Sequence, residues 1–186
     1  MSNEVWAAIG EVVIAARAAM GWLQKASRVL SKANIPIMWH TPTGFLVYQG
    51  ILQSKTVKVE TQLCGRLQLD IRRSIDRIDS YKQANGVAPN FVHSMDAAHL
   101  ASTVLLGKSK GIKNWAMIHD DFGTHAAITA EMHSSIREAF CAIYSNKNWL
   151  AEWKEEQEKH GVELAELPAT GDLNIKEVLE ALYFFG

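Results

Sequence analysis

Cysteine is scarce in this 186-residue chain, and no apolar run is long enough to cross a bilayer. The two cysteines, Cys64 and Cys141, fit no zinc-binding spacing, so reduced thiols are the expectation. Every apolar run falls short of the roughly 20 residues of a membrane-spanning helix. The first residues include Glu4 and lack a basic start, which argues against a signal peptide. We therefore expect a globular protein of the cytoplasm that has no membrane as a partner.

A strong excess of one charge is also missing, since the formal net charge is −1. A self-sufficient DNA-binding domain usually has a basic surface. The charge is unevenly distributed, however, with seven Lys or Arg against four acids over residues 54–82, and four against nine from residue 147 onward. Because a phosphate backbone responds to a local basic patch, residues 54–82 are a candidate DNA-binding segment. A hydrated hairpin of mixed charge is the alternative.

The periodicity of apolar residues predicts a mixture of helices and short strands, an α+β fold. The expected helices cover residues 3–33, a short stretch closing at 82–86, a segment from Phe91 or Ser94 to Leu106 opened by Pro89 and Asn90, and residues 129–145, 148–160 and 174–184. Extended segments are expected at residues 37–39 and 45–49. Alternation over residues 55–60 and 66–71 predicts a projecting β-hairpin, whose size suits a DNA major groove.

The sequence NWAMIHDDFGTHAA, residues 114–127, predicts a strand that ends in two adjacent carboxylates. The apolar run over residues 115–118 leads into Asp120 and Asp121, with Gly123 two residues later, which predicts a tight hairpin turn. Two neighbouring carboxylates repel each other unless a cation compensates them, and their hard oxygens suit Mg²⁺. A solvated turn is the alternative, because Asp and Gly are common in turns.

Two motifs together give the chain a family resemblance. PNFVHSMD, residues 89–96, and HDDFGTH, residues 119–125, occur in the order and at the separation found in single-subunit RNA polymerases of bacteriophages and mitochondria, which this chain resembles. The likeness continues through WHTPTGFLVYQ, residues 39–49, and LPATGDLNIKEVLE, residues 167–180, so it covers essentially the whole chain. It implies template-directed nucleotidyl transfer with two Mg²⁺ ions.

The resemblance also implies roles for individual residues. Asp120 matches a catalytic metal ligand, and His119 is expected near the RNA 3′ end. Asp121 occupies a position that varies in the family and points to the opposite face of an extended chain, so we expect it to be either a solvated acid or an acid that supports the metal site indirectly, and not a ligand. His93 is expected at the minor-groove side of the template–transcript duplex. A zinc site built from His93, Asp96 and His99 is an alternative with little support, because it lacks the usual ligand pattern.

The hairpin at about residues 55–71 matches the family's promoter-recognition loop. Arg66 and Gln68 are expected to read guanine and adenine there. The tail ending in Phe184, Phe185 and Gly186 departs from the family's usual end, which leaves the contact of the terminal carboxylate with the active centre open.

The resemblance implies a partial right-hand polymerase fold, with a fingers-derived helix and β-hairpin in residues 1–90 and the C-terminal half of the palm in residues 91–186. The first catalytic aspartate is not matched, so a separate polypeptide is expected to supply the rest of the enzyme, and the isolated chain is expected to be inactive. The partners would be promoter and template DNA, the RNA transcript and nucleoside triphosphates. A split enzyme, an intron-interrupted gene and a decayed remnant all remain open, as do a DNA polymerase I-like fragment, a non-catalytic DNA-binding module and an independent metal hydrolase.

Overall fold

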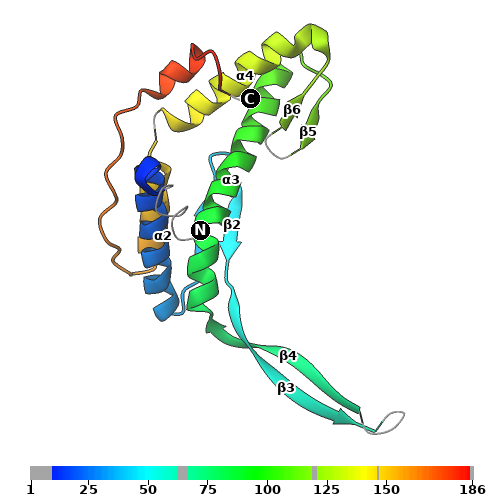
Figure 1. Cartoon of the computed structure of the whole chain (residues 1–186), viewed down its shortest axis with the longest axis vertical. Coiled ribbons are helices and arrows are strands. Elements are labelled where there is room, and N and C mark those ends of the chain that lie inside the picture. Colours follow the sequence, from blue (N-terminus) through cyan, green and yellow to red (C-terminus); the bar gives the residue numbers. More distant parts are fainter. Residues whose placement is uncertain (1–9, 63–66, 119–120, 146, 185–186) are drawn as a thin grey trace.

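The computed structural model describes residues 10–62, 67–118, 121–145 and 147–184. The chain forms helices and two-stranded antiparallel sheets, which confirms the α+β class (Figure 1). In chain order the elements are α2 Ile14–Lys32, β1 Ile37–His40, β2 Leu46–Gln49, β3 Leu52–Thr61, β4 Leu67–Ile78, α3 Ser80–Ser109, β5 Ala116–Ile118, β6 Asp121–Gly123, α4 Thr129–Tyr144 and α5 Trp149–Glu158, with 3₁₀ turns at Ala126–Ile128 and Ile175–Leu179. In this part of the chain, every helix is too short or too polar to cross a membrane.

Helix α3 is a single element of 30 residues, so the predicted break and new helix start at Pro89 were wrong. The helix begins where the Asp79 carboxylate accepts a hydrogen bond from the Lys82 backbone N–H at 3.1 Å. Pro89 removes one helical hydrogen bond, at a cost of about 3 kcal/mol. Buried residues on both sides of the proline, including Val87 and Met95, offset that cost by packing into the protein.

The main hydrophobic core lies between α2, α5, β1 and the N-terminal half of α3. Trp22 and Trp153 meet edge to face with ring centroids 5.6 Å apart. The core residues are Trp22, Leu23, Ala26, Leu30, Ile37, Trp39, Val87, Ala88, Trp153 and Leu164. This core holds α3 as the axis of the molecule, with one β-hairpin at each end (Figure 1).

The hairpin β3–β4 projects from one end of α3 and is longer than predicted (Figure 1). Its strands extend to Leu52 and Ile78, so Arg72, Arg73 and Arg77 lie within β4, although the sequence pattern placed them after the hairpin. Regular antiparallel pairing extends toward the base of the hairpin as far as Ser54 opposite Ser74. The predicted strands were therefore right in kind and too short.

The base of the hairpin is tied to the body by side-chain amides. The Asn34 side chain accepts a hydrogen bond from the Ile78 N–H at 2.8 Å. Asn34 itself has a φ of 57°, in the left-handed region. Gln49 and Gln83 exchange hydrogen bonds with each other's backbone carbonyls, and Gln83 also accepts from the Ile51 N–H at 3.0 Å. Because Gln83 is fully buried, these bonds fix where the hairpin leaves the body.

The predicted helix near the start of the chain is interrupted at Val13, and the one near its end is shorter than predicted. Helix α2 begins at Ile14, residues 10–12 are also helical, and residues 1–9 lie outside the described residues. The expected helix at 174–184 is only a 3₁₀ turn, Ile175–Leu179, begun by an Asn174 side chain that accepts from the Lys176 N–H at 3.2 Å. A turn this short without buried residues of its own gains little from continuing as a helix.

Candidate functional site

The two strands predicted on either side of the acidic turn are present as β5 and β6. Ala116 pairs with Gly123, Met117 with Phe122 and Ile118 with Asp121. Asp121 ends the ladder and is exposed, as expected for a solvated acid. His119 and Asp120, the residues between the strands to which catalytic and metal-binding roles were assigned, lie outside the described residues.

The β5–β6 hairpin rests on the C-terminal half of α3 and on α4. Trp115 and Phe122 pack on a small core of Ile112, Met132 and Ile136. At Gly123 a β-carbon would come within 3.2–3.3 Å of Ala116, so glycine allows the two strands to approach closely. The hydroxyl of Thr124 donates to the Asn114 carbonyl at 2.8 Å and closes the open end of the hairpin.

His99 is the buried polar residue beneath this hairpin. Its Nε2 lies 2.8 Å from the Ile136 carbonyl, and its ring lies 5.8 Å from Phe122 and 5.6 Å from Phe140, between centroids. Burial lowers the pKa of His99, so the neutral imidazole donates to that carbonyl. His99 thereby joins α3 to α4 and supports β6. The sequence signal for this role is that His99 follows Met95 by four residues and so lies on the same buried side of the helix. From the sequence alone, His99 is named only as part of the zinc alternative.

The zinc alternative does not fit the observed burial. His93 and Asp96 are exposed on α3, whereas His99 is buried and bonded to a backbone carbonyl. Over the described ranges, no group of three or more His, Cys, Asp or Glu lies close enough to hold a metal ion.

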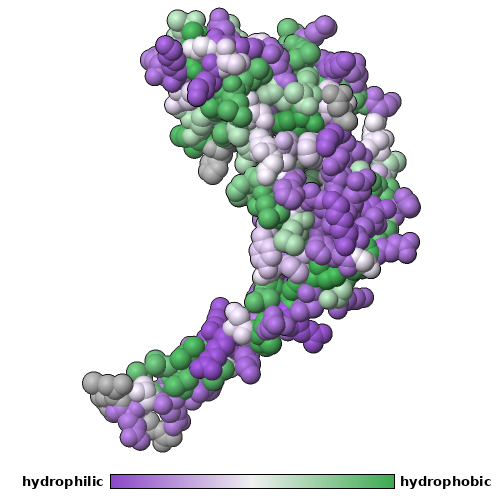
Figure 2. All heavy atoms as spheres, turned by 180° about the vertical axis from the view of Figure 1, so that it is seen from behind, coloured by the Kyte–Doolittle hydropathy of each residue, from purple (hydrophilic) through white to green (hydrophobic). Residues whose placement is uncertain are grey.

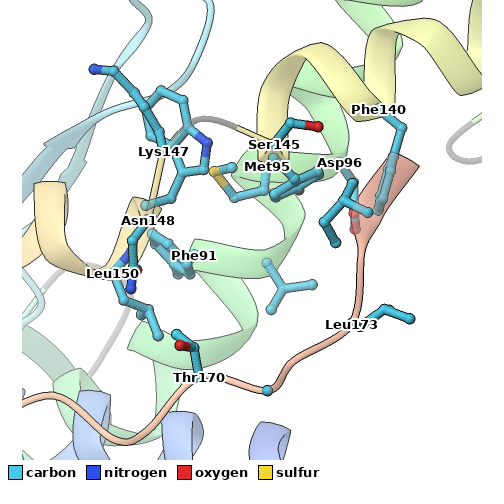
Figure 3. A pocket seen from close by; sticks show the side chains of 15 residues that line it. Phe91, Met95, Asp96, Phe140, Ser145, Lys147, Asn148, Leu150, Thr170 and Leu173 are labelled. Atoms are coloured by element: carbon cyan, nitrogen blue, oxygen red, sulfur yellow. The ribbon is translucent and has the colours of Figure 1, made fainter. Parts of the chain in front are cut away.

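An open groove of about 780 Å³ is lined in part by residues of the PNFVHSMD motif on α3, although His93 itself does not line it. Side chains from α3, α4, the start of α5 and the segment 170–175 converge on it, as Figure 3 shows. Phe91, Val92, Met95, Phe140 and Leu173 give it a largely apolar wall, with Asp96 and Lys147 as charged groups. Burial raises the pKa of Tyr144, which also lines it, to about 12. The tyrosine therefore stays protonated, and the groove is suited to apolar or planar groups.

Arg137 holds the last described turn of the chain against α4, a role that the sequence gave no pattern to find. This buried guanidinium donates from Nη1 to the carbonyls of Val178, at 3.1 Å, and Ala181. We call these bonds from Arg137 to the carbonyls of Val178 and Ala181 the Arg137 clamp. Beyond it in the chain, the ring of Phe184 packs edge to face on Phe140, with centroids 4.8 Å apart. Phe185 and Gly186 lie outside the described residues, so the contact of the terminal carboxylate stays open.

The predicted DNA-reading hairpin contains one of its two assigned residues among those described. Gln68 is exposed on β4, opposite Glu60 of β3. Arg66, the other candidate, lies outside the described residues. Two rows further along the ladder, Lys58 is paired with Asp70 across the strands.

All these features are arranged along α3. Gln83 holds the base of β3–β4, His93 is exposed ten residues later, and Gly107 lies under Trp115 of the other hairpin. At 1.5 Å per residue, the 24 residues from Gln83 to Gly107 span roughly 36 Å. One rigid helix therefore sets the separation of the two hairpins and places His93 between them.

Comparison with known proteins gives a consistent result. The family model described as DNA-dependent RNA polymerase matches residues 1–162. The T7 RNA polymerase of Escherichia phage T7 is 33% identical over all of this chain and 23% of its own length. The DNA-directed RNA polymerase of Pseudomonas phage phiKMV is 36% identical over all of this chain and 22% of its own length. The chloroplastic DNA-directed RNA polymerase 3B of Nicotiana tabacum is 35% identical over 96% of this chain and 18% of its own length. The chain thus spans less than a quarter of the length of these relatives.

Proposed function

The chain belongs to the DNA-dependent RNA polymerase family, and from this premise we propose that it is the C-terminal fingers-and-palm part of a single-subunit RNA polymerase. It would act in transcription, with promoter and template DNA, nucleoside triphosphates and the growing RNA as partners. A separate polypeptide would supply the remaining parts of the right-hand fold. The proposed place of action is the cytoplasm, that of the host cell if a phage encodes the chain.

The observation that carries this proposal is that residues of both family motifs, PNFVHSMD and HDDFGTH, lie on or against helix α3. His93, from PNFVHSMD, is exposed on α3, and the β5–β6 hairpin, which carries part of HDDFGTH, contacts the same helix where Trp115 meets Gly107 and Phe122 meets His99. A duplex that contacts both elements would run along α3, with the histidine at its minor groove and the carboxylates at its growing end. This arrangement favours a polymerase over an independent metal hydrolase, which would have no need of a nucleic-acid contact on α3.

The proposed metal is Mg²⁺, with Asp120 as its ligand from this chain. Bound there, it would activate the RNA 3′ hydroxyl and stabilise the charge of the triphosphate. Two ions need carboxylates from at least two strands, and the described acid nearest to Asp120, Asp121, is exposed at the end of its ladder. The second carboxylate would therefore come from the separate polypeptide, and for this reason we expect the isolated chain to be inactive.

Complementation tests this function. The full chain is mixed with a polypeptide carrying the remainder of a phage RNA polymerase of this family, and ribonucleotide incorporation on duplex templates is measured with Mg²⁺. We expect incorporation by the mixture and none by either component. Incorporation of deoxyribonucleotides in preference would favour a DNA polymerase, whereas silence of the mixture with intact DNA binding would favour a non-catalytic module or a remnant. Nuclease activity of the chain alone would favour the hydrolase.

A further inference from the structure

The β3–β4 hairpin has two chemically different faces, because its ladder is regular from Ser54–Ser74 to Thr61–Leu67. Side chains alternate between the faces along each strand, and directly opposed residues share a face. The register therefore assigns every described side chain of this region to one face or the other.

The first of these, here called the apolar face, is largely hydrophobic. Leu67, Leu69 and Ile71 on it are 51%, 43% and 40% exposed. Its members are Lys55, Val57, Val59, Thr61, Leu67, Leu69, Ile71 and Arg73. Hydrophobic side chains are visible along the projecting hairpin in Figure 2. The two cations on this face, Lys55 and Arg73, stand directly opposite each other at its basal end, where like charges repel.

The second face, here called the polar face, offers a hydrogen-bonding group at every step. Its rows are Ser54 with Ser74, Thr56 with Arg72, Lys58 with Asp70, and Glu60 with Gln68. Gln68 and Arg72 are four residues apart on one strand, a distance of roughly 13 Å along it. Arg72 therefore lies on the same face as the glutamine assigned to base reading and at a separation that matches about four base-pair steps of 3.4 Å.

Only one of the two faces suits a DNA groove. A duplex lying on the apolar face would desolvate its base edges against Leu69 and Ile71, and would meet polar side chains only at the two ends of that face, in Thr61 and in the basal pair Lys55 and Arg73. On the polar face, the same groups would meet hydrogen-bonding side chains in every row: the guanidinium of Arg72, the ammonium of Lys58 and the amide of Gln68, with the carboxylates of Asp70 and Glu60 opposite the last two. Duplex DNA is favoured over duplex RNA because a two-stranded ribbon enters the wide major groove of B-form DNA, whereas the major groove of A-form RNA is deep and narrow.

We infer that the polar face of the β3–β4 hairpin is the DNA-contacting face, with Arg72 as a further DNA contact beside Gln68, and that the apolar face, including Arg73, does not touch DNA. This inference rests on the proposed function, since it assumes that the hairpin binds promoter DNA. Arg72 is in reach of guanine edges or of phosphate oxygens about four base-pair steps from the base that Gln68 reads. Its neighbour Arg73, identical in charge, points to the other side of the ribbon.

This pair of adjacent arginines provides a matched test. Binding of the full-length chain to a fluorescent 25-base-pair DNA duplex is measured by anisotropy between 50 and 200 mM salt, for the unmodified protein, Arg72→Ala and Arg73→Ala. The two variants change net charge equally, so long-range attraction is matched and only direct contact distinguishes them. We expect Arg72→Ala to weaken binding about tenfold and to flatten the salt dependence by roughly one unit of slope. Arg73→Ala should weaken binding less than about twofold and leave that slope unchanged.

Other results would overturn the inference. An equal loss in the two variants would mean that charge acts without a preferred face, and a larger loss in Arg73→Ala would assign DNA to the apolar face. A chain that does not bind duplex DNA would exclude the contact altogether. Circular dichroism of the three proteins checks that the exposed substitutions leave the fold intact. The complementation assay separates failure of this inference from failure of the proposed function. If the mixture incorporates ribonucleotides while Arg72→Ala and Arg73→Ala weaken DNA binding equally, only the inference fails. If the mixture is silent while Arg72→Ala alone weakens DNA binding, only the proposed function fails.

Discussion

Trp115 lies so close to Gly107 of α3 that a β-carbon built on the glycine would collide with the far edge of the indole ring. This contact joins the long helix to the segment that leads into β5. The absence of a side chain at position 107 thus lets the indole seat the hairpin directly on the helix backbone.

Gly107→Ala is therefore expected to lower the free energy of unfolding. Overpacking costs about 1–3 kcal/mol, which outweighs the gain in helix propensity of under about 1 kcal/mol. Gly21→Ala is the control, because a β-carbon at position 21 of α2 meets nothing within 4 Å. There we expect stabilisation of roughly 0.5–1 kcal/mol. Urea denaturation measures both, and equal stabilisation of the two variants would refute the contact.

Stability should fall as the pH drops below the ordinary pKa of histidine, and His99 should be a main cause. Burial lowers the folded-state pKa of His99 below its ordinary value of 6.5, so the unfolded chain binds its proton first as the pH falls. The stabilisation is therefore fully present above pH 6.5 and is lost as the pH falls through the folded-state pKa. We expect His99→Gln to flatten this decline in thermal denaturation between pH 7.5 and 5. His93→Gln, at an exposed position on the same helix, should leave the decline unchanged.

Removal of the Arg137 clamp should release the C-terminal segment. Arg137→Gln removes the guanidinium that binds the carbonyls of Val178 and Ala181, so trypsin should cleave after Lys176 several-fold faster. Glu138→Gln is the control, because that carboxylate pairs with Lys110 at 2.6 Å and not with the tail. Mass spectrometry of timed digests identifies the cleavage, and a similar rate in all three proteins would contradict the clamp.

The comparison of sequence and structure shows which signals were strong. Alternation of polar and apolar residues predicted β3 and β4, and a short apolar run followed by two acids and a glycine predicted β5. Pro89 misled the prediction, since a local helix breaker was overridden by packing of Val87 and Met95, which depends on partners far away in the sequence.

The polar contacts that hold the candidate site had no local sequence signal. Gln83 binds Ile51 from 32 residues away, and Arg137 binds carbonyls more than 40 residues away. Glutamine and arginine are ordinary surface residues by composition, so only the fold identifies these two as buried connectors. His93 and Gln68, by contrast, came from motif resemblance, and the structure leaves both exposed and available for contact.

The adjacent carboxylates at positions 120 and 121 provide the sharpest test of the proposed chemistry. In the complemented enzyme, Asp120→Asn should reduce ribonucleotide incorporation by roughly 10³-fold or more, because a lost ligand removes several kcal/mol of transition-state stabilisation. Asp121→Asn should stay within about threefold, since Asp121 is exposed at the end of the β6 ladder and successive side chains on a strand point to opposite faces. Both substitutions remove one negative charge from neighbouring positions, which makes each the control for the other. Incorporation rates at saturating Mg²⁺ decide between them, and a larger loss in Asp121→Asn would move the metal ligand to that residue.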